Sequence, residues 1–378
     1  MAILTELAVE DYSLHMEIGL TPTLSSLPGP VLVTGHTGFK GAWLTILLEH
    51  LGIPAIGYSL KPDRGSLFER GGFQDRIPEI FADIRDSGKL RSFIELYKPS
   101  CVIHMAAQPL VLESYKNPIE TFDVNVMGTA NLLEISFKYE FIKCIVVVTT
   151  DKVYRNENTG HKFIETDPLG GKDPYSSSKV ATENVVSAWQ QISRIQSGPK
   201  VISVRAGNVI GGGDFAKNRI IPDLVRSILI KKEDVVIRNP ENTRPWLHVL
   251  DPLAGYLRAL ESGLLGKKGL SYNFAPDCEN LSVREVAEKF ITLSGYELKL
   301  IIDNSNKSLE ASYLNLDATK AKKELNWSCF WTQSESINRS FDWWQKVLKH
   351  KSSAIELCKE EVIIFLQKSK LLDVAKNA

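Results

Sequence analysis

A tyrosine and a lysine four residues apart, Tyr175 and Lys179 in the segment PYSSSK, are the first candidates for chemistry in this sequence. Residues at this spacing lie on one face of a helix. An ammonium group beside a phenol favours the phenolate and lowers the pKa of the phenol. With a nearby hydroxyl, from Thr149 or Thr150, such a phenolate can take the proton of an alcohol. The spacing therefore predicts an acid–base pair for alcohol oxidation.

A second acid–base pair, Asp151 and Lys152, directly follows the two threonines. Simple alcohol oxidation does not need this pair. The threonines close a hydrophobic run, residues 145–148, that predicts a buried strand. A neighbouring carboxylate and ammonium could also be an ion pair in a turn, and that alternative stays open at this point. If the pair is catalytic, the reaction includes proton transfers beyond the oxidation.

Three glycines, Gly35, Gly38 and Gly41, lie between a predicted strand, residues 31–34, and an apolar helical pattern that includes Trp43. Glycine lets the backbone turn tightly and lets a pyrophosphate approach the first turn of a helix. A plain tight turn would explain the glycines alone, but the strand before and the helix after favour a dinucleotide site.

Short β-rich runs alternate with helical patterns from Pro30 onward. We expect strands at residues 30–34, 55–58, 80–82, 101–104, 144–149 and 201–205, and helices that include 87–97, 119–139 and 175–193. This alternation predicts an α/β protein with a Rossmann-type, doubly wound parallel sheet. Because ligands of such sheets bind beyond the carboxyl ends of the strands, the glycine turn, residues 104–108 and residues 149–152 should line one crevice.

The pattern loosens after Arg205, which suggests a second unit. We divide the chain into an N-terminal extension (1–28), a dinucleotide-binding domain (29–205), a smaller mixed α/β lobe (206–350) and a C-terminal helical tail (351–378). The smaller lobe is mainly for substrate binding, and some of its segments are expected to return to the first domain. Two amphipathic helices are predicted from about residue 334 onward.

The sequence does not decide between NAD and NADP. No carboxylate stands directly at the end of the second strand, where an acidic residue usually holds the ribose of NAD. Lys61 and Arg64 could accept the 2′-phosphate of NADP or could be solvated surface residues. Asp83 ends the third strand, where it could meet the adenine or cap the next helix.

Composition excludes several other functions. The 378 residues carry 45 basic and 45 acidic side chains, so there is no basic surface typical of nucleic-acid binding. No apolar run is long enough to predict a membrane span, and the N-terminus lacks a signal-peptide layout. The five cysteines are widely spaced without a Cys-x-x-Cys pair, so we expect no metal site and a reducing, cytoplasmic environment.

With these segments placed, the chain resembles the extended short-chain dehydrogenase/reductases, and among them the nucleotide-sugar 4,6-dehydratases that act on CDP-glucose. The resemblance covers residues 30–350, roughly, and its segments include VTGHTGFKGAWL from Val33, HMAAQPLV from His104, NVMGT from Asn125 and VRAGNVIGGGD from Val204. Most related dehydratases carry Asp-Glu after the threonine, whereas Asp151-Lys152 is similar to the CDP-glucose branch.

The resemblance implies a reaction in which hydride leaves the sugar C4 for NAD, water leaves C6, and the same hydride returns to C6. It implies that Tyr175 takes the 4-hydroxyl proton, Asp151 acts as the acid and Lys152 helps to remove the C5 proton. The implied catalytic residues are Thr150, Asp151, Lys152, Tyr175 and Lys179. The implied cofactor-binding residues are Gly35, Thr37, Gly38, Phe39, Lys40, Gly41, Ser59, Asp83, Ile84, Ala106, Ala107, Gln108, Asn125, Thr149, Tyr175 and Lys179. The implied substrate-binding residues are Gln108, Asn208, Arg219, Arg238, Arg244 and His248, although each arginine could instead form a surface salt bridge.

Three departures from the family pattern lie near expected substrate contacts. The arginine usual after the QPLV segment is Leu112, residues 153–161 replace an expected aromatic stretch, and an expected histidine is Leu309. The nucleotide base and the sugar therefore stay open. The alternatives are a 4-epimerase or 4-reductase, a dehydratase of another nucleotide hexose and, more remotely, a non-catalytic dinucleotide sensor. Apolar residues on several faces of the helices at 119–139 and 175–193 predict a homodimer or homotetramer.

Overall fold

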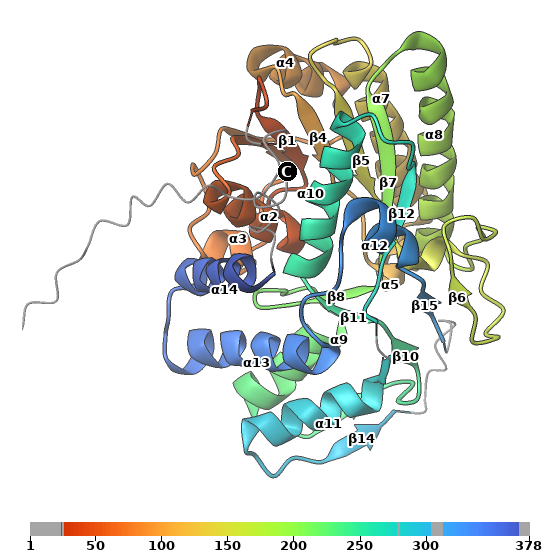
Figure 1. Ribbon diagram of the computed structural model, residues 1–378. Coiled ribbons are helices and arrows are strands. Elements are labelled where there is room, and N and C mark those ends of the chain that lie inside the picture. The colour runs from red at the N-terminus through yellow and green to blue at the C-terminus, as the bar shows by residue number, and fades with distance from the viewer. Residues whose placement is uncertain (1–23, 25, 278–279, 304–312, 370–378) are drawn as a thin grey trace, which may run out of the picture.

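The computed structural model describes residues 24, 26–277, 280–303 and 313–369. Its centre is a seven-stranded sheet in the order β12-β7-β5-β4-β1-β2-β3, with every neighbouring pair parallel (Figure 1). The strands are β1 (Val31–Thr34), β2 (Ala55–Ser59), β3 (Glu79–Phe81), β4 (Cys101–His104), β5 (Cys144–Val148), β7 (Lys200–Ala206) and β12 (Ser271–Phe274). This arrangement confirms the predicted Rossmann-type α/β fold.

The apolar strands of the sheet build two cores, one on each face. Side chains alternate between the faces along a strand, so Val31 and Val33 of β1 join one core, whereas Leu32 joins the other. The central strands are buried on both faces, which explains why they read as continuous apolar runs rather than as alternating ones.

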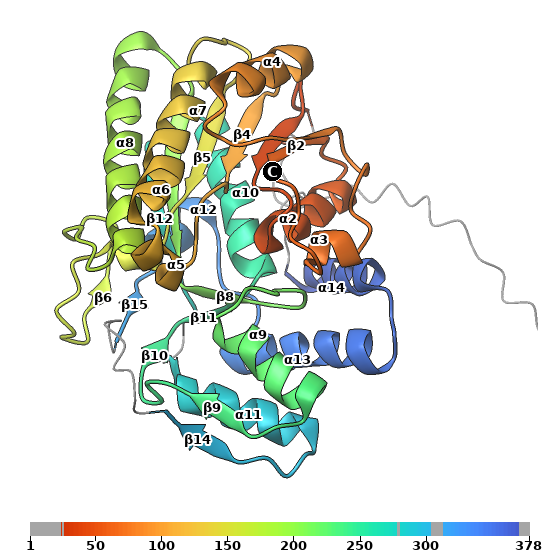
Figure 2. The same cartoon turned by 180° about the vertical axis from the view of Figure 1, so that it is seen from behind.

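Helices cover both faces of this sheet. On the face seen in Figure 1 lie α2 (Phe39–His50), α10 (Leu250–Leu264) and α12 (Thr319–Leu325). On the opposite face, seen in Figure 2, lie α4 (Ser87–Tyr97), α6 (Pro118–Phe122), α7 (Gly128–Ser136) and α8 (Pro174–Gln196). Two short helices, α3 (Leu67–Arg70) and α5 (Val111–Lys116), follow β2 and β4.

Segments after β7 form a smaller lobe beyond the carboxyl ends of the strands. It contains α9 (Ile220–Leu224), a π-helical stretch at Val225–Lys231, α11 (Val283–Ser294) and α13 (Gln333–Lys349). Four small two-stranded ladders accompany the helices, and they pair β8 (Asn208–Ile210) with β11 (Trp246–His248), β9 (Val235–Ile237) with β14 (Leu300–Ile302), β10 (Thr243–Arg244) with β13 (Leu281–Ser282), and β6 (Lys162–Phe163) with β15 (Asn315–Leu316).

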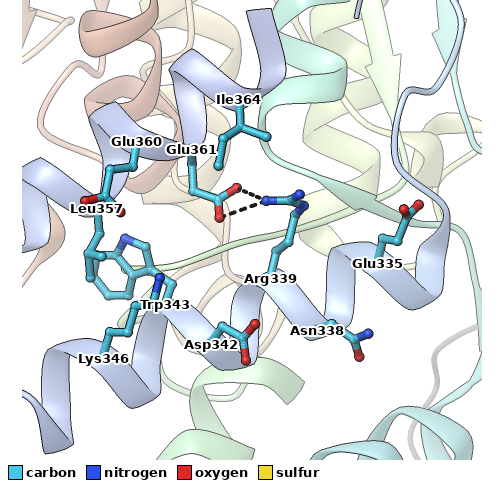
Figure 3. A pocket seen from close by; sticks show the side chains of 10 residues that line it. All are labelled: Glu335, Asn338, Arg339, Asp342, Trp343, Lys346, Leu357, Glu360, Glu361 and Ile364. Atoms are coloured by element: carbon cyan, nitrogen blue, oxygen red, sulfur yellow. Dashed lines mark hydrogen bonds and ion pairs between the residues drawn. The ribbon is translucent and has the colours of Figure 1, made fainter. Parts of the chain in front are cut away.

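The two amphipathic helices predicted near the C-terminus are α13 and α14 (Ala354–Lys368). Arg339 of α13 donates two hydrogen bonds of 3.0 and 3.1 Å to the carboxylate of Glu361 of α14 (Figure 3). The same guanidinium lies 4.3 Å from the centre of the Trp331 ring. The pocket between α13 and α14 contains none of the predicted site residues. Residues 1–23, 25 and 370–378, most of the predicted extension and the end of the predicted tail, lie outside the described residues.

The helix predicted at 119–139 is interrupted in the structure. A π-helical turn, Asp123–Met127, separates α6 from α7. The carbonyl of Asn125 in this turn accepts hydrogen bonds from the hydroxyls of Thr129 and Thr182. Such bulges occur often at functional sites, and this one contains a predicted cofactor residue. Among the described residues, no helix is both long and apolar enough to span a bilayer.

Candidate active site

The glycine turn joins β1 to α2 with close backbone contacts. Gly35 has a φ of +76°, and a Cβ atom there would lie 2.8 Å from the backbone nitrogen of Ala106. A Cβ atom on Gly41 would lie 2.2 Å from the carbonyl oxygen of Gly35. Only glycine fits either position. Gly38 precedes α2 without a side-chain cap, and the first turn of α2 has no acidic residue, so its N–H groups suit a pyrophosphate.

The side of the turn expected to face the adenosine is built by the ends of β2 and β3. The hydroxyl of Thr37 lies 2.7 Å from that of Ser59 and donates to the carbonyl of Leu60. Asp83 binds the guanidinium of Arg85 at 2.6 Å. The N-cap of α4 is Asp86, not Asp83, because the Asp86 carboxylate accepts from Lys89 N. The capping alternative for Asp83 is therefore wrong.

Behind the turn, Ile84 is buried, and its methyl group lies where a Cβ atom on Gly128 would stand. The position of this residue, at the start of the segment after β3, fixes how closely α7 packs against the sheet. Its predicted contact with the cofactor stays a prediction.

The loop after β4 is held from two sides. Thr34 accepts a hydrogen bond from Ala106 N, and Asn125 accepts one from Gln108 N at 2.8 Å. The amide of Asn125 also donates to the carbonyl of Gln108 and to the hydroxyl of Ser178 in α8. Asn125 therefore fixes the predicted cofactor loop, including Ala107, to the helix that carries the tyrosine and lysine.

A short 3-10 helix, Asp151–Val153, follows β5, and Thr150 is its N-cap. We call residues 150–152 the acid turn. The Asp151 side chain is 1% exposed, and its Oδ1 atom accepts from the hydroxyl of Thr150 at 3.0 Å and from the ammonium of Lys152 at 3.4 Å. Its other oxygen, Oδ2, is buried and has no hydrogen-bond partner in the described part of the chain. A buried carboxylate oxygen without a hydrogen-bond partner, which we call the orphan oxygen, is costly to bury. It is suited to accept a hydrogen bond from a substrate group.

Tyr175 lies beside the acid turn at the start of α8. Asp173 caps this helix with a reciprocal capping box, Pro174 occupies its first turn, and Ser114 accepts from Tyr175 N. Burial raises the pKa of Tyr175, while the charge of Lys152 and a hydrogen bond with Thr150 oppose that rise. The predicted lowering of this pKa by Lys179 is therefore wrong for this structure, because burial outweighs the nearby positive charges.

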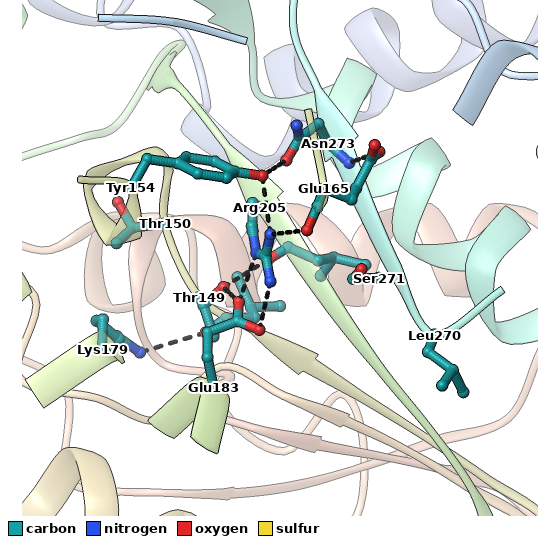
Figure 4. Close-up of polar contacts among 12 residues, drawn as sticks. Thr149, Thr150, Tyr154, Glu165, Lys179, Glu183, Arg205, Leu270, Ser271 and Asn273 are labelled. Atoms are coloured by element: carbon teal, nitrogen blue, oxygen red, sulfur yellow. Dashed lines mark hydrogen bonds and ion pairs between the residues drawn. The ribbon is translucent and has the colours of Figure 1, made fainter. Parts of the chain in front are cut away.

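Lys179 points from α8 toward the end of β5. Its ammonium donates to the carbonyl of Val148 at 3.2 Å, and burial lowers its pKa to about 8 against the opposing charge of Glu183. The hydroxyl of Thr149 donates to Glu183 at 2.5 Å (Figure 4). The spacing alone left Thr149 and Thr150 open for the hydroxyl beside Tyr175, whereas the resemblance implied Thr150, and the hydrogen bond between Thr150 and Tyr175 agrees with that choice.

Lys40 extends from the glycine turn into the same cluster. Burial lowers its pKa to about 7, and the charges of Arg219 and Lys179 add to this effect, while those of Asp151 and Asp214 oppose it. Its ammonium lies 3.4 Å from the hydroxyl of Tyr256 in α10. The glycine turn, the acid turn and α8 therefore meet at one centre.

Apart from Gln108 in the loop after β4, the predicted substrate residues come from the smaller lobe and differ in their surroundings. Arg219 pairs with Asp214 at 3.2 Å, and its positive charge opposes the rise in the pKa of Tyr175. Asn208 is half-buried on β8, Arg244 is buried on β10, and Arg238 is exposed after β9.

His248, the remaining predicted substrate residue, is 1% exposed and lies edge-on to two tryptophan rings, Trp43 at 5.9 Å and Trp331 at 4.3 Å. Burial holds its pKa well below the ordinary range. These contacts are those of a core residue, so its predicted role in substrate binding stays a prediction.

Comparison with known proteins agrees with this site. Residues 31–275 match the NAD dependent epimerase/dehydratase family. The chain belongs to this family. It is 44% identical over 324 residues to a CDP-glucose 4,6-dehydratase of Salmonella typhimurium, an alignment that covers 83% of this chain and 89% of that enzyme.

Two solved structures of the epimerase/dehydratase family have the same fold. The dTDP-glucose 4,6-dehydratase of Bacillus anthracis, in complex with NAD, is 26% identical with a TM-score of 0.72 and covers 84% of this chain and 97% of its own. The UDP-glucose 4-epimerase of Thermotoga maritima, with UDP-glucose, has a TM-score of 0.75 at 22% identity and covers 85% of this chain and all of its own. The second likeness shows the fold alone.

One buried ion pair at the centre of this epimerase/dehydratase was not predicted. Glu183 and Arg205 form an ion pair in which each side chain is 5% exposed. Glu183 stands four residues after Lys179, so the spacing Tyr-x-x-x-Lys-x-x-x-Glu contained a signal for it. The sequence contained no comparable signal for Arg205, because an arginine after an apolar run is read as the end of a strand.

Proposed function

We propose that this protein is a nucleotide-sugar 4,6-dehydratase that uses NAD and converts CDP-glucose to CDP-4-keto-6-deoxyglucose with loss of water. The observation that carries the proposal is Asp151, a buried carboxylate with one unpartnered oxygen beside the phenol of Tyr175. A 4-epimerase has no step that needs a second acid at this place. The identity of 44% to a CDP-glucose dehydratase supports CDP-glucose as the substrate.

NAD, when bound, supplies the acceptor for the hydride of C4 and the donor of the same hydride to C6. The glycine turn would hold its pyrophosphate, because Gly35 and Gly41 leave no room for a side chain and the N-terminus of α2 offers free N–H groups. Lys179 lies within reach of the same crevice and would hold the ribose hydroxyls.

In the oxidation, the Tyr175 phenolate takes the proton of the 4-hydroxyl. Thr150 hydrogen-bonds to the phenol, and the charges of Lys152 and Arg219 favour the phenolate. The positive groups of the site therefore offset part of the effect of burial on this tyrosine.

In the elimination, the new 4-ketone acidifies the C5 proton. The Asp151–Lys152 pair can exist as carboxylate and ammonium or, after one proton shift, as carboxylic acid and neutral amine. In the second form Lys152 takes the C5 proton while Asp151 protonates the C6 hydroxyl, which leaves as water. Lys152 then returns its proton to C5 as hydride reaches C6, and transfer of a proton from Tyr175 to Asp151 restores the starting state. Steps of this kind contribute about 10²–10⁴-fold each.

Substrate phosphates and sugar would be held mainly by the smaller lobe, together with Gln108 of the cofactor domain. We assign this role to Gln108, Asn208, Arg219, Arg238, Arg244 and His248, and we keep the division into a cofactor domain at 29–205 and a substrate lobe at 206–350. Arg219 has the firmest support, since its charge acts on the pKa of Tyr175. Arginine suits the phosphates because its donors match their geometry in pairs. The scattered cysteines support a cytoplasmic site of action.

Isotope transfer tests the proposed function. Purified protein is incubated with NAD and CDP-glucose deuterated at C4, and the product is analysed by mass spectrometry and by the base-induced absorbance of the keto sugar. We expect the deuterium to appear in the new methyl group. Solvent hydrogen in that position, or a product that is only the C4 epimer, would overturn the proposal. Parallel reactions with dTDP-, UDP- and GDP-glucose test the base.

We also propose that the protein is a homodimer or homotetramer. Ile119, Phe122 and Met127 are 84%, 39% and 51% exposed. They belong to α6 and the π-helical turn, which pack beside α8 (Figure 2). An exposed apolar patch of this kind marks an interface. Light scattering should give at least twice the mass of 42.2 kDa, and Ile119→Glu should lower it. A wild-type monomer at micromolar concentration would contradict the proposal.

A further inference from the structure

A buried hydrogen-bond network lies behind the acid turn and joins three elements of the fold. Its centre is the pair formed by Glu183 of α8 and Arg205 of β7 (Figure 4). The guanidinium binds both carboxylate oxygens, with 2.8 Å from Nε to Oε1 and 2.8 Å from Nη2 to Oε2. This bidentate geometry fixes the direction of both side chains.

Both flanks of the acid turn bind this one ion pair. On one side, Thr149 donates its hydroxyl to Glu183. On the other side, Tyr154 accepts a hydrogen bond of 2.8 Å from Nη1 of Arg205. Because only residues 150–153 lie between these two anchors, their fixed separation constrains the path of the catalytic backbone.

A second layer keeps Tyr154 in place. Its hydroxyl donates to Oδ1 of Asn273 on β12 at 2.7 Å, and its ring stacks on Phe163 at 4.9 Å. The backbone nitrogen of Asn273 in turn donates to Glu165, and the carbonyl of Glu165 accepts from Arg205. The hydroxyl of Tyr154 therefore has both its donor and its acceptor function used within a buried site, which leaves it one orientation.

The same pair also touches the helix of the oxidation step. Glu183 stands one helical turn after Lys179 and two turns after Tyr175. The pair is therefore the element shared by the groups that oxidise C4 and by the groups that remove water from C5 and C6. None of its members lies against the orphan oxygen of Asp151, so their contribution is to position other groups.

We propose that Tyr154, bound to the Glu183–Arg205 pair, is a positioning residue that holds the acid turn in the geometry needed for elimination. The inference rests on the proposed function. Loss of the Tyr154 hydroxyl should loosen only the downstream flank of the turn, whose backbone still pairs with that of Leu169, while the contacts of Thr149, Glu183 and Lys179 remain. Elimination should therefore suffer more than oxidation.

The test is Tyr154→Phe in the full-length enzyme, because it removes one hydroxyl and keeps the ring that stacks on Phe163. In single-turnover reactions with CDP-glucose, the absorbance of the reduced cofactor reports oxidation, and the keto-deoxy sugar reports the complete reaction. We expect cofactor reduction within about threefold of the wild-type rate and product formation about 10- to 100-fold slower, with reduced cofactor accumulating.

Tyr272→Phe is the matched control. Tyr272 is a buried tyrosine on the same strand as Asn273, and its hydroxyl donates to Glu324 at 2.9 Å, outside the network. It should lower thermal stability to a similar degree without accumulation of reduced cofactor. Arg205→Lys, which keeps the charge but loses the bidentate contact, should reproduce the accumulation if the variant folds.

Two results would overturn the inference. One is a Tyr154→Phe enzyme in which both rates are unchanged, and the other is one in which both are slowed equally, as loss of a merely structural residue would do. Wild-type enzyme that forms no keto-deoxy sugar would instead refute the proposed function, so the two failures are distinguishable.

Discussion

Replacing Asp151 by asparagine separates elimination from oxidation more directly than any other single change. Asparagine has the shape of aspartate, and its amide oxygen can still accept from the hydroxyl of Thr150 and from the ammonium of Lys152. The change removes the acid and its negative charge and leaves the packing of a side chain that is 1% exposed. The perturbation is therefore chemical rather than steric.

The magnitude follows from two parts of the structure. Loss of a general acid slows its step about 10²–10⁴-fold, which corresponds to about 3–5 kcal/mol in the activation barrier. Lys152 is 24% exposed, so loss of its ion pair should lower the free energy of unfolding by about 1 kcal/mol or less. The charge of Asp151 raises the pKa of Tyr175, so its removal should leave oxidation unimpaired or slightly faster.

The assay follows reduced cofactor and keto-deoxy sugar in one turnover. Asp151→Asn should reduce bound NAD at a rate near that of the wild type and then stop, with product formation about 10²–10⁴-fold slower. Asp167→Asn is the matched control, since Asp167 accepts from His161 and from Ile164 N outside the acid turn. Product formation within about threefold of the wild type, or equal loss of both signals, would refute the assignment of Asp151 as the acid.

Three further predictions concern the cofactor turn, a cation and a buried acid. Gly41→Ala places a methyl group 2.2 Å from a backbone carbonyl and should weaken NAD binding at least tenfold by calorimetry, whereas Gly88→Ala, whose Cβ atom would make an ordinary contact of 3.6 Å with the Asp86 carboxylate, should not. Burial lowers the pKa of Lys179 to about 8, so its positive charge is lost above that pH; activity should fall there, and Lys179→Arg should move the fall to higher pH. Burial raises the pKa of Asp251 from 3.8 to about 7, so its contribution to stability is complete below pH 3.8 and is lost as the pH rises through 7. The full shift corresponds to about 4 kcal/mol, and Asp251→Asn should flatten the fall in melting temperature between about pH 4 and about pH 7, the interval between the two pKa values; an unchanged slope would contradict this.

The sheet was predictable because its signal is local. Central strands that are buried on both faces are rich in apolar side chains, and six short β-rich runs fall between helical patterns in the first part of the chain. The seventh strand, β12, was not predicted as a strand, because it returns to the sheet from residues 271–274 and pairs with β7. A pairing across this separation depends on tertiary structure, which a local pattern does not contain.

The site shows the same division between local and distant information. Tyr175 and Lys179 could be predicted because a helix fixes their spacing, and Asp151 because it follows a strand. The direction of the pKa shift of Tyr175 could not be predicted, since it depends on burial by several elements. The interruption of the helix at Asp123–Met127 was missed for a related reason, because the side chain of Thr182 on another helix binds a carbonyl of this turn.

The two adjacent threonines show how a distant contact settles a local ambiguity. From residue type and spacing alone, Thr149 and Thr150 are equal candidates for the hydroxyl beside the phenol, and only the resemblance favoured Thr150. The hydroxyl of Thr149 is used by Glu183, whose own direction is fixed by Arg205. A hydroxyl that donates to a buried carboxylate is not available to a substrate, so the role beside Tyr175 falls to Thr150, which also binds Asp151. The ion pair thus determines which threonine takes part in the chemistry, and it does so without touching the reacting atoms.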